Sequence, residues 1–416
     1  MKSWLKRLLG KKPQHTFPVV WDVQLPSVYA RLEQTYDQPQ PLAWDNNLLE
    51  CQPLGDSDEA FWSPGALEGT MIYHFGIGSD GPGTDEILTA LQLALAKPGV
   101  KTFHELYVLI TQDSPLHYID DLLKAITEAR GLPADRLYEL VMMLCTRSPD
   151  RNAVKFAMAI IAFFPQQRSV EVLRVLARHD EFTLYAVVAL RSMVEPEQYP
   201  DIWFAMAKRV NGWGRIHLME RMPEIMDATM RCWLLREGFS NSVMNEYAAV
   251  NCAVRGELVE ALATEHDDAL LLGAAEILYA LLNEGPVPGM SVYEDGANAC
   301  LRYLQNVQAY HPAHPLHFLT AKRIGEWAQN AASLDTTHSS QLAAMSSEIL
   351  TLNIWDDVIA QALAGDEDYV FNLAIDVSRD RNEDPFPKLF ARQRDRPDAT
   401  LWYQLMQTDD PHQVKL

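Results

Sequence analysis

The sequence predicts an all-α protein, an α-solenoid of stacked helical hairpins with an irregular N-terminal extension. Two ladders of apolar residues predict this fold. The rungs of the first are thirty residues apart, at Leu173, Trp203, Trp233 and Ala263. The rungs of the second are thirty-one apart, at Tyr185, Ile216 and Tyr247. A period near thirty with two helices per period is typical of stacked α-hairpins, because each pair has an apolar face that only its neighbours can bury.

The charge of the chain limits the kinds of partner that it can bind. The 416 residues include 35 lysines and arginines against 56 aspartates and glutamates, so the formal net charge is −21. Such a surface repels the phosphates of nucleic acids, which excludes general nucleic-acid binding. It suits a partner with a basic patch, or serves solubility alone.

The cysteines and the hydropathy of the chain predict a cytoplasmic location. The five cysteines are far apart, form no Cys-x-x-Cys pair and are mostly embedded in apolar helical sequence. They are typical of reduced core cysteines rather than of a disulfide framework. The sequence has no uncharged apolar run of the roughly 18 residues that a membrane span needs. It also lacks the continuous apolar core of a signal peptide.

Residues 1–12, MKSWLKRLLGKK, predict a basic amphipathic tail, since they hold five basic residues and no acid. On a helical wheel one arc holds the apolar side chains Trp4, Leu5, Leu8 and Leu9. Lys6 and Arg7 fall opposite. This layout predicts weak peripheral contact with an anionic membrane surface, such as the inner face of the cell membrane. The alternative is that the same apolar face docks onto the protein's own helices or onto a partner.

Residues 13–83 predict an ordered but irregular extension, because eight prolines break any long helix and the segment is rich in aromatic residues. We expect one helix near 28–35 and a short strand near 70–75. A glycine pattern of the form Gly-x-Gly-x-x-Gly follows that strand, at Gly76, Gly78 and Gly81. Strand, glycines and helix in this order are typical of dinucleotide sites. The acids around the glycines and the lack of a following strand favour a simple turn instead.

Residues 84–285 predict the HEAT-like repeat array, with amphipathic helices over 84–147 and then four helix pairs. The paired helices are predicted over 152–164 and 168–177, 182–194 and 200–210, 213–222 and 225–237, and 241–254 and 257–263. A longer helix over 269–283 ends the array before the break Gly-Pro-Val-Pro-Gly at 285–289.

Residues 291–416 predict a C-terminal helical lobe or cap. Its expected helices are 291–310, 317–332, 342–364, 368–377 and 400–406. We expect a loop over 333–340. Residues 380–398 are charged and contain prolines, which predicts surface coil.

Within the predicted array, polar and charged residues are densest in the third and fourth helix pairs. The candidate binding residues are Trp213, Arg215, His217, Glu220, Arg221, Arg236, Asn245, Glu246 and Tyr247. Equivalent positions of adjacent repeats lie side by side, so these groups would converge on one patch, with Arg215 and Glu246 on one surface. The alternative is that the tryptophans belong to the core and the charged residues pair between repeats. We also expect Trp203 and Trp233 to be buried at equivalent places on successive second helices.

At these residues the chain resembles a family of mostly uncharacterised bacterial proteins. The shared sequence covers residues 140–285 and includes Asn-Gly-Trp-Gly-Arg-Ile-His from Asn211, Trp-Leu-Leu-Arg-Glu-Gly from Trp233 and Met-Asn-Glu-Tyr from Met244. Some members carry a limonene hydroxylase label. A hydroxylase needs haem, flavin or non-haem iron, and this sequence has no ligand set or fingerprint for any of them. The array is also similar to HEAT or armadillo-type repeats, which implies binding of protein partners on an extended surface.

The segment 311–317, His-Pro-Ala-His-Pro-Leu-His, is a second candidate site. In a polyproline II conformation, with three residues per turn, one side would present His311, His314 and His317. Histidines on one face can bind zinc, although the segment has no acid or cysteine to complete the ligand set. The alternative is a proline loop that leads into the next helix. We therefore predict no metal site and no cofactor.

These observations favour a non-catalytic, cytoplasmic scaffold that binds a protein partner, one with a basic patch. The alternative is an enzyme with a polar pocket between the third and fourth pairs, built from Arg215, His217, Glu220 and Glu246. In that case His217 or Glu246 would serve as the acid or base. A closed pocket lined by these residues would favour the enzyme, and pairing among them would favour the scaffold.

Overall fold

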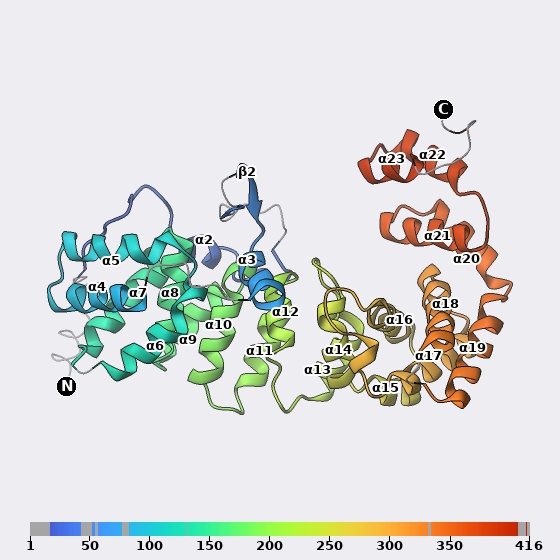
Figure 1. The fold of residues 1–416 in the computed structure, drawn as a ribbon, viewed down its shortest axis with the longest axis horizontal. Coiled ribbons are helices and arrows are strands. Elements are labelled where there is room, and N and C mark those ends of the chain that lie inside the picture. Colours follow the sequence, from blue (N-terminus) through green and yellow to red (C-terminus); the bar gives the residue numbers. More distant parts are fainter. Residues whose placement is uncertain are drawn as a thin grey trace, which may run out of the picture. The chain divides into compact units, whose positions relative to one another are not determined.

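A computed structural model describes residues 17–42, 52–54, 57–76, 83–129, 131–331, 334–406 and 413 (Figure 1). Helices account for nearly all regular structure in these ranges, and consecutive helices pack in pairs as stacked hairpins do. The all-α prediction is confirmed at this level. Residues 1–12 lie outside the described residues, so the amphipathic tail stays a prediction.

The chain divides into two compact units. One comprises Met1–Met226 with Asn241–Val243, and the other Asp227–Ser240 with Met244–Leu416. The border falls inside the predicted array of 84–285, near its third helix pair. The predicted domain limits at 83 and 285 stay predictions. Each unit is described separately below.

The N-terminal extension is more helical than the sequence predicted. The helix expected near 28–35 is confirmed as α2 (Val28–Glu33). A two-stranded antiparallel hairpin follows, formed by β1 (Gln52–Leu54) and β2 (Ser57–Trp62). The strand predicted near 70–75 is wrong, because α3 (Ala66–Thr70) runs into a π-helical turn, η1 (Met71–Phe75). A helix satisfies its own backbone groups, whereas a lone strand here would have no partner.

This correction also removes the basis of a dinucleotide site, because the segment directly before Gly76 is helical and not a strand. Gly76 directly follows η1 with a left-handed φ of 76°. Gly78 and Gly81 lie outside the described residues. The glycine run therefore connects a helix to a helix, α4 (Thr84–Ala96), which begins at the predicted residue.

Unit 1 continues with helices that follow the predicted amphipathic pattern. They are α4, α5 (Val100–Gln112), η2 (Pro115–His117), α6 (Ile119–Glu128), α7 (Ala134–Arg147), α8 (Arg151–Ile161), α9 (Gln167–Leu176), α10 (Asp180–Met193), α11 (Tyr199–Ala207) and α12 (Trp213–Met219). Figure 1 shows α4 and α5 alongside each other, and α8, α10 and α12 pack in succession. Asp150 caps α8, where its side chain accepts a hydrogen bond from the Ala153 N–H at 2.9 Å.

Unit 2 contains the remaining helices. They are α13 (Ala228–Trp233), its π-helical continuation η3 (Leu234–Gly238), α14 (Glu246–Arg255), α15 (Leu258–Thr264), α16 (Asp268–Asn283), η4 (Met290–Val292), α17 (Gly296–Tyr310), α18 (Pro315–Asn330), α19 (Thr336–Leu350), α20 (Ile354–Ala364), α21 (Asp368–Asp380), α22 (Phe386–Asp395) and α23 (Ala399–Leu405). A short break over 351–353 divides the long helix predicted over 342–364.

Two loop predictions in unit 2 are wrong. Residues 336–340, predicted as loop, open α19, which Asp335 caps by accepting from the Thr337 and His338 N–H groups. Part of the predicted coil over 380–398 forms α22, because Phe386 and Leu389 pack into a small core with α21 and α23. The many charged residues of this segment led to the coil prediction. Its few apolar residues nevertheless have the spacing of an amphipathic helix.

The predicted burial of the two ladder tryptophans is confirmed. Trp203 on α11 is 0% exposed and Trp233 on α13 is 8% exposed. Cys145, Cys252 and Cys300 are buried as predicted, whereas Cys232 is exposed. Within the described ranges, no helix has the length and apolar character that a membrane crossing requires.

Candidate functional site

Two of the predicted site residues of unit 1, Trp213 and His217, lie beneath the N-terminal extension. Trp213 and His217, one turn apart on α12, are 6% and 0% exposed. The Tyr73 ring lies 5.9 Å from the Trp213 ring and 6.4 Å from the His217 ring. Gly69 of α3 lies so close to Trp213 that a Cβ there would overlap the indole. The extension therefore covers the face of α12 on which the sequence placed a binding site.

The other predicted residues of this unit are engaged locally. Arg215 is 7% exposed, and its Nε donates to the Val210 carbonyl at 2.8 Å. Arg221 Nη1 lies 3.4 Å from a Glu220 carboxylate oxygen near the surface. Asp180 accepts from the Gly214 N–H at 2.7 Å and holds the start of α12. These contacts favour a structural role for the charged residues of α12.

His217 has unusual surroundings for a buried histidine. Neither of its ring nitrogens has a hydrogen-bond partner among the described residues. Burial, with a smaller contribution from the nearby Arg221, lowers the pKa of His217 to about 3. The ring is therefore neutral at pH 7.

Replacing His217 by phenylalanine should flatten the acid dependence of stability. The folded pKa lies below the ordinary value near 6.5, so this histidine's contribution is complete above pH 6.5 and is lost as the pH falls. Between pH 7 and pH 5 this linkage costs about 2 kcal/mol. Urea unfolding at both pH values should show a smaller loss for His217→Phe than for the wild type. His104→Phe, at an exposed position of α5, should keep the wild-type loss. An equal loss in both variants would contradict the expectation.

The predicted residues of unit 2 are also engaged in polar contacts. Arg236 Nη2 lies 2.7 Å from Glu265 and 2.5 Å from Asp267. Asn245 donates to Glu276 at 3.3 Å, and Glu246 accepts from the Asn283 amide at 2.7 Å. Tyr247 is 9% exposed.

The surface on which we expected both Arg215 and Glu246 would need residues of two different compact units. Arg215 belongs to the first unit and Glu246 to the second. A common surface lined by both residues therefore stays a prediction.

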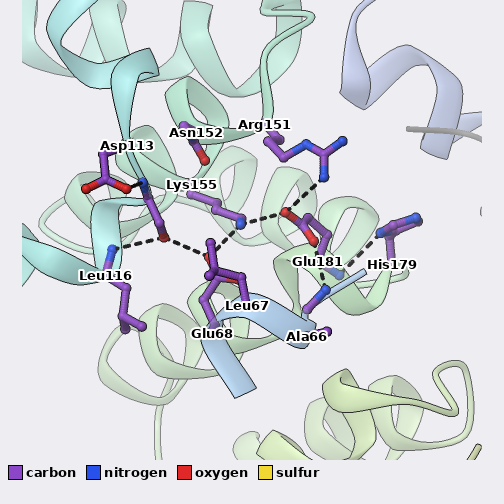
Figure 2. A network of polar contacts seen from close by, with 12 residues as sticks. Ala66, Leu67, Glu68, Asp113, Leu116, Arg151, Asn152, Lys155, His179 and Glu181 are labelled. Carbon is purple, nitrogen blue, oxygen red and sulfur yellow. Dashed lines mark hydrogen bonds and ion pairs between the residues drawn. The ribbon is translucent and has the colours of Figure 1, made fainter. Parts of the chain in front are cut away.

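The described residues of unit 1 contain a buried cluster of charges that sequence reasoning missed (Figure 2). Lys155 of α8 is 0% exposed, and its Nζ lies 2.5 Å from Glu68 of α3 and 2.6 Å from Glu181 of α10. Arg151 Nη1 approaches the same Glu181 oxygen at 3.5 Å. The Ser114 hydroxyl donates to Glu68 at 2.9 Å. The cluster joins α3 of the extension to α8 and α10.

Backbone contacts complete this cluster. The other Glu181 oxygen accepts from the Gly65 N–H at 2.7 Å, just before α3 begins. The Glu181 N–H in turn donates to His179 Nδ1 at 3.3 Å. Burial lowers the pKa of His179 to about 4, so its ring is neutral and can accept. Glu181 thus holds α3 by a backbone bond as well as by the shared lysine.

The charges in the cluster stabilise one another. Burial works against the charged form of Lys155, but the carboxylates of Glu181 and Glu68 outweigh it and raise the pKa of the lysine. Burial also works against the charged form of Glu181, but Lys155 and Arg151 outweigh it and lower the pKa of that carboxyl. A lysine held protonated is a poor nucleophile, and a carboxyl held ionised is a poor general acid. The arrangement favours a structural clasp over catalysis.

One feature of the sequence indicates this cluster. Lys155 stands in the apolar run Ala-Val-Lys-Phe-Ala-Met-Ala, and a lysine on a buried helix face needs an acidic partner. The partners lie 87 and 26 residues away, at Glu68 and Glu181. No sequence spacing relates Lys155 to these two acids. Only the packing of α3 and α10 against α8 shows that Glu68 and Glu181 are its partners.

Unit 2 has a groove of about 530 Å³ lined by α16, α18 and α21. Its apolar lining residues are Tyr279, Leu282, Leu319 and Trp327. Its charges mostly pair: Lys322 lies 2.5 Å from Asp380 and Arg379 lies 3.1 Å from Asp376. The groove is within the size range of ligand sites. Because most of its charged residues pair with one another, the lining favours neither an anionic nor a cationic ligand.

A smaller cavity of unit 2, about 160 Å³, has an acidic rim. The rim acids are Glu265, Asp267 and Asp268, and the His266 and Tyr310 rings, 5.1 Å apart, form part of the wall. Leu262, Leu270 and Leu271 add apolar surface. One cation, Arg236, neutralises part of this rim.

The histidine segment 311–317 forms a helix–turn–helix connection. His311 ends α17 with a left-handed φ of 50°, and His314 caps α18 by accepting from the Leu316 N–H at 3.3 Å. His317 is buried inside α18 and its Nδ1 lies 2.8 Å from the Tyr303 hydroxyl. The predicted polyproline conformation is therefore wrong. No group of three or more potential metal ligands occurs in the described part of the chain.

We compared the chain with protein-family models, curated proteins and solved structures, and none of the three comparisons found a match. These comparisons therefore do not support the resemblance to the bacterial family, and no family is identified for this chain. The supported description is an all-helical protein with many packed helices.

Proposed function

We propose that this protein is a non-catalytic scaffold, a HEAT-like solenoid of helical hairpins that binds a protein partner carrying a basic patch. The net charge of −21 and the paired packing of the helices support this role. The observation that carries the proposal is the acid-rimmed cavity of unit 2 around Tyr310. It combines the three features that a protruding lysine or arginine needs.

These features act on different parts of the basic side chain. Leu262 and Leu271 line the cavity and contact the methylene groups. The Tyr310 ring, half exposed at 52%, attracts a cation placed over its face. Asp268, which is exposed in the first turn of α16 and pairs with no described cation, supplies a carboxylate.

Arg236 sets the charge of the cavity rim. It pairs with Glu265 and Asp267, and hydrogen bonding from Arg236 lowers the pKa of Asp267. The rim thus keeps net negative charge while two of its acids are held in place. An incoming arginine would share these carboxylates in a charge-assisted pair.

The test is titration of the full chain with a short arginine-rich peptide, compared between two matched variants. Asp268→Asn removes the rim carboxylate. Asp121→Asn removes an exposed acid at the equivalent first turn of α6, so the net charge changes equally. We expect Asp268→Asn to weaken binding about tenfold and Asp121→Asn to leave it nearly unchanged, because general attraction depends only on net charge.

Equal weakening in the two variants, or no binding of the peptide at moderate salt, would refute the cavity as the contact site. Affinity capture from the native host, with wild type and Asp268→Asn in parallel, then identifies the partner. The partner sought is a protein that the wild type retains and Asp268→Asn releases.

A further inference from the structure

Three arginines of unit 1 lie together without acidic partners. Arg174 is in the last turn of α9, Arg178 lies two residues beyond that helix, and Arg209 lies two residues beyond the end of α11. All three line one small cavity with Tyr36, Ala177, Ala205 and Met206. None of the three forms an ion pair with any residue that the structure describes. In a chain of net charge −21, this is an unusual concentration of unbalanced positive charge.

Arg178 is the inner member of this arginine cluster. Its side chain is 2% exposed, its Nη2 donates to the Gln40 carbonyl at 2.9 Å and its Nε to the Thr35 hydroxyl at 3.4 Å. Its remaining nitrogen, Nη1, is buried and has no hydrogen-bond partner within the described ranges. Burial, together with the charge of Arg209, lowers the pKa of this guanidinium. A buried donor without a partner costs free energy that a bound acceptor would recover.

The two outer arginines, Arg174 and Arg209, also line the cavity. Arg209 lies over the Tyr36 ring at 5.0 Å, and both Arg209 and Arg174 are partly exposed. The helix ends favour cations there, which explains why arginines are tolerated but leaves the Nη1 donor unsatisfied. Other buried or half-buried arginines do meet acids: Arg151 pairs with Glu181, and Arg392 with Asp368 at 2.5 Å.

We propose that Arg174, Arg178 and Arg209 form an anion site that takes a phosphate group. The cavity, about 10 Å³, has room for a single oxygen atom, which would accept from Arg178 Nη1. The other phosphate oxygens would lie at the surface between Arg174 and Arg209. Guanidinium groups match phosphate geometry with paired N–H donors, and a dianion balances most of the charge of three arginines.

The test uses the full chain at constant ionic strength. Calorimetric titration and thermal unfolding are run with inorganic phosphate, glycerol phosphate and sodium chloride. We expect phosphate to raise the melting temperature above that in chloride. Tighter binding of glycerol phosphate than of inorganic phosphate would assign the site to phosphate esters, and equal binding would assign it to the phosphate group alone.

Two variants and a control decide whether the arginine cluster is responsible. Arg174→Gln and Arg209→Gln, both at partly exposed positions, should each weaken phosphate binding by about tenfold or more. Arg147→Gln removes an exposed arginine from the last turn of α7 and should bind as the wild type does. The proposal is overturned if phosphate stabilises no more than chloride, or if Arg147→Gln weakens binding as much as Arg209→Gln.

Discussion

Replacing Lys155 by methionine should destabilise the first unit by about 3–5 kcal/mol, the cost of leaving buried charges without their partner. Glu68 and Glu181 would remain buried and would lose the ammonium group 2.5 and 2.6 Å away. Arg151, at 3.5 Å from Glu181, would compensate only one of them. Urea unfolding of the purified chain at pH 7 measures the loss.

A companion variant separates the charge effect from the loss of packing. Lys155→Met combined with Glu68→Gln and Glu181→Gln removes all three charges, and we expect it to recover at least half of the lost stability. Lys101→Met, whose side chain is 88% exposed, should change the free energy of unfolding by no more than about 0.5 kcal/mol. If Lys155→Met cost as little as Lys101→Met, the clasp would not be what stabilises this unit.

The same variant has a local consequence. The clasp fixes α3, so amide hydrogens of residues 66–75 should exchange faster in Lys155→Met than in the wild type. Because α3 and η1 cover Trp213 and His217, their release would expose the face of α12 that the sequence analysis selected. Unchanged exchange over residues 66–75 would show that apolar packing alone holds the extension.

Replacing Trp203 by alanine should also cost about 3–5 kcal/mol, because it leaves a large cavity in the core. The indole is 0% exposed, and its Nε1 donates to the Leu218 carbonyl at 2.9 Å. Trp233→Ala should fall in the same range, since that indole is 8% exposed. Chemical unfolding monitored by circular dichroism gives both values.

Two controls test the reason for this loss. Trp203→Phe keeps most of the volume and should cost clearly less than Trp203→Ala. Trp402, on α23, is 55% exposed, so Trp402→Ala should cost less than about 1 kcal/mol. If Trp402→Ala lowered the free energy of unfolding as much as Trp203→Ala and Trp233→Ala do, burial of the indole would not explain the loss of stability.

The sequence by itself determined most helices over residues 84–285 and their buried faces. Apolar spacing placed the ladder tryptophans correctly, because the period of a helix is local and independent of what packs on it. The same reasoning failed at α3, η1 and α22. These segments are short, so a helical period has little length in which to appear, and their helical state depends on packing against other helices.

Only the tertiary structure decided which polar residues lie together. Lys155 meets Glu68 and Glu181 from positions 87 and 26 residues away, and Arg178 meets Arg209 across two helices. Trp213 and His217, chosen for the local density of polar and aromatic residues on α12, are instead buried beneath the chain's own extension. Periodicity reports which side of a helix is apolar, whereas the identity of the group facing each polar side chain is fixed by packing between segments that no sequence period relates.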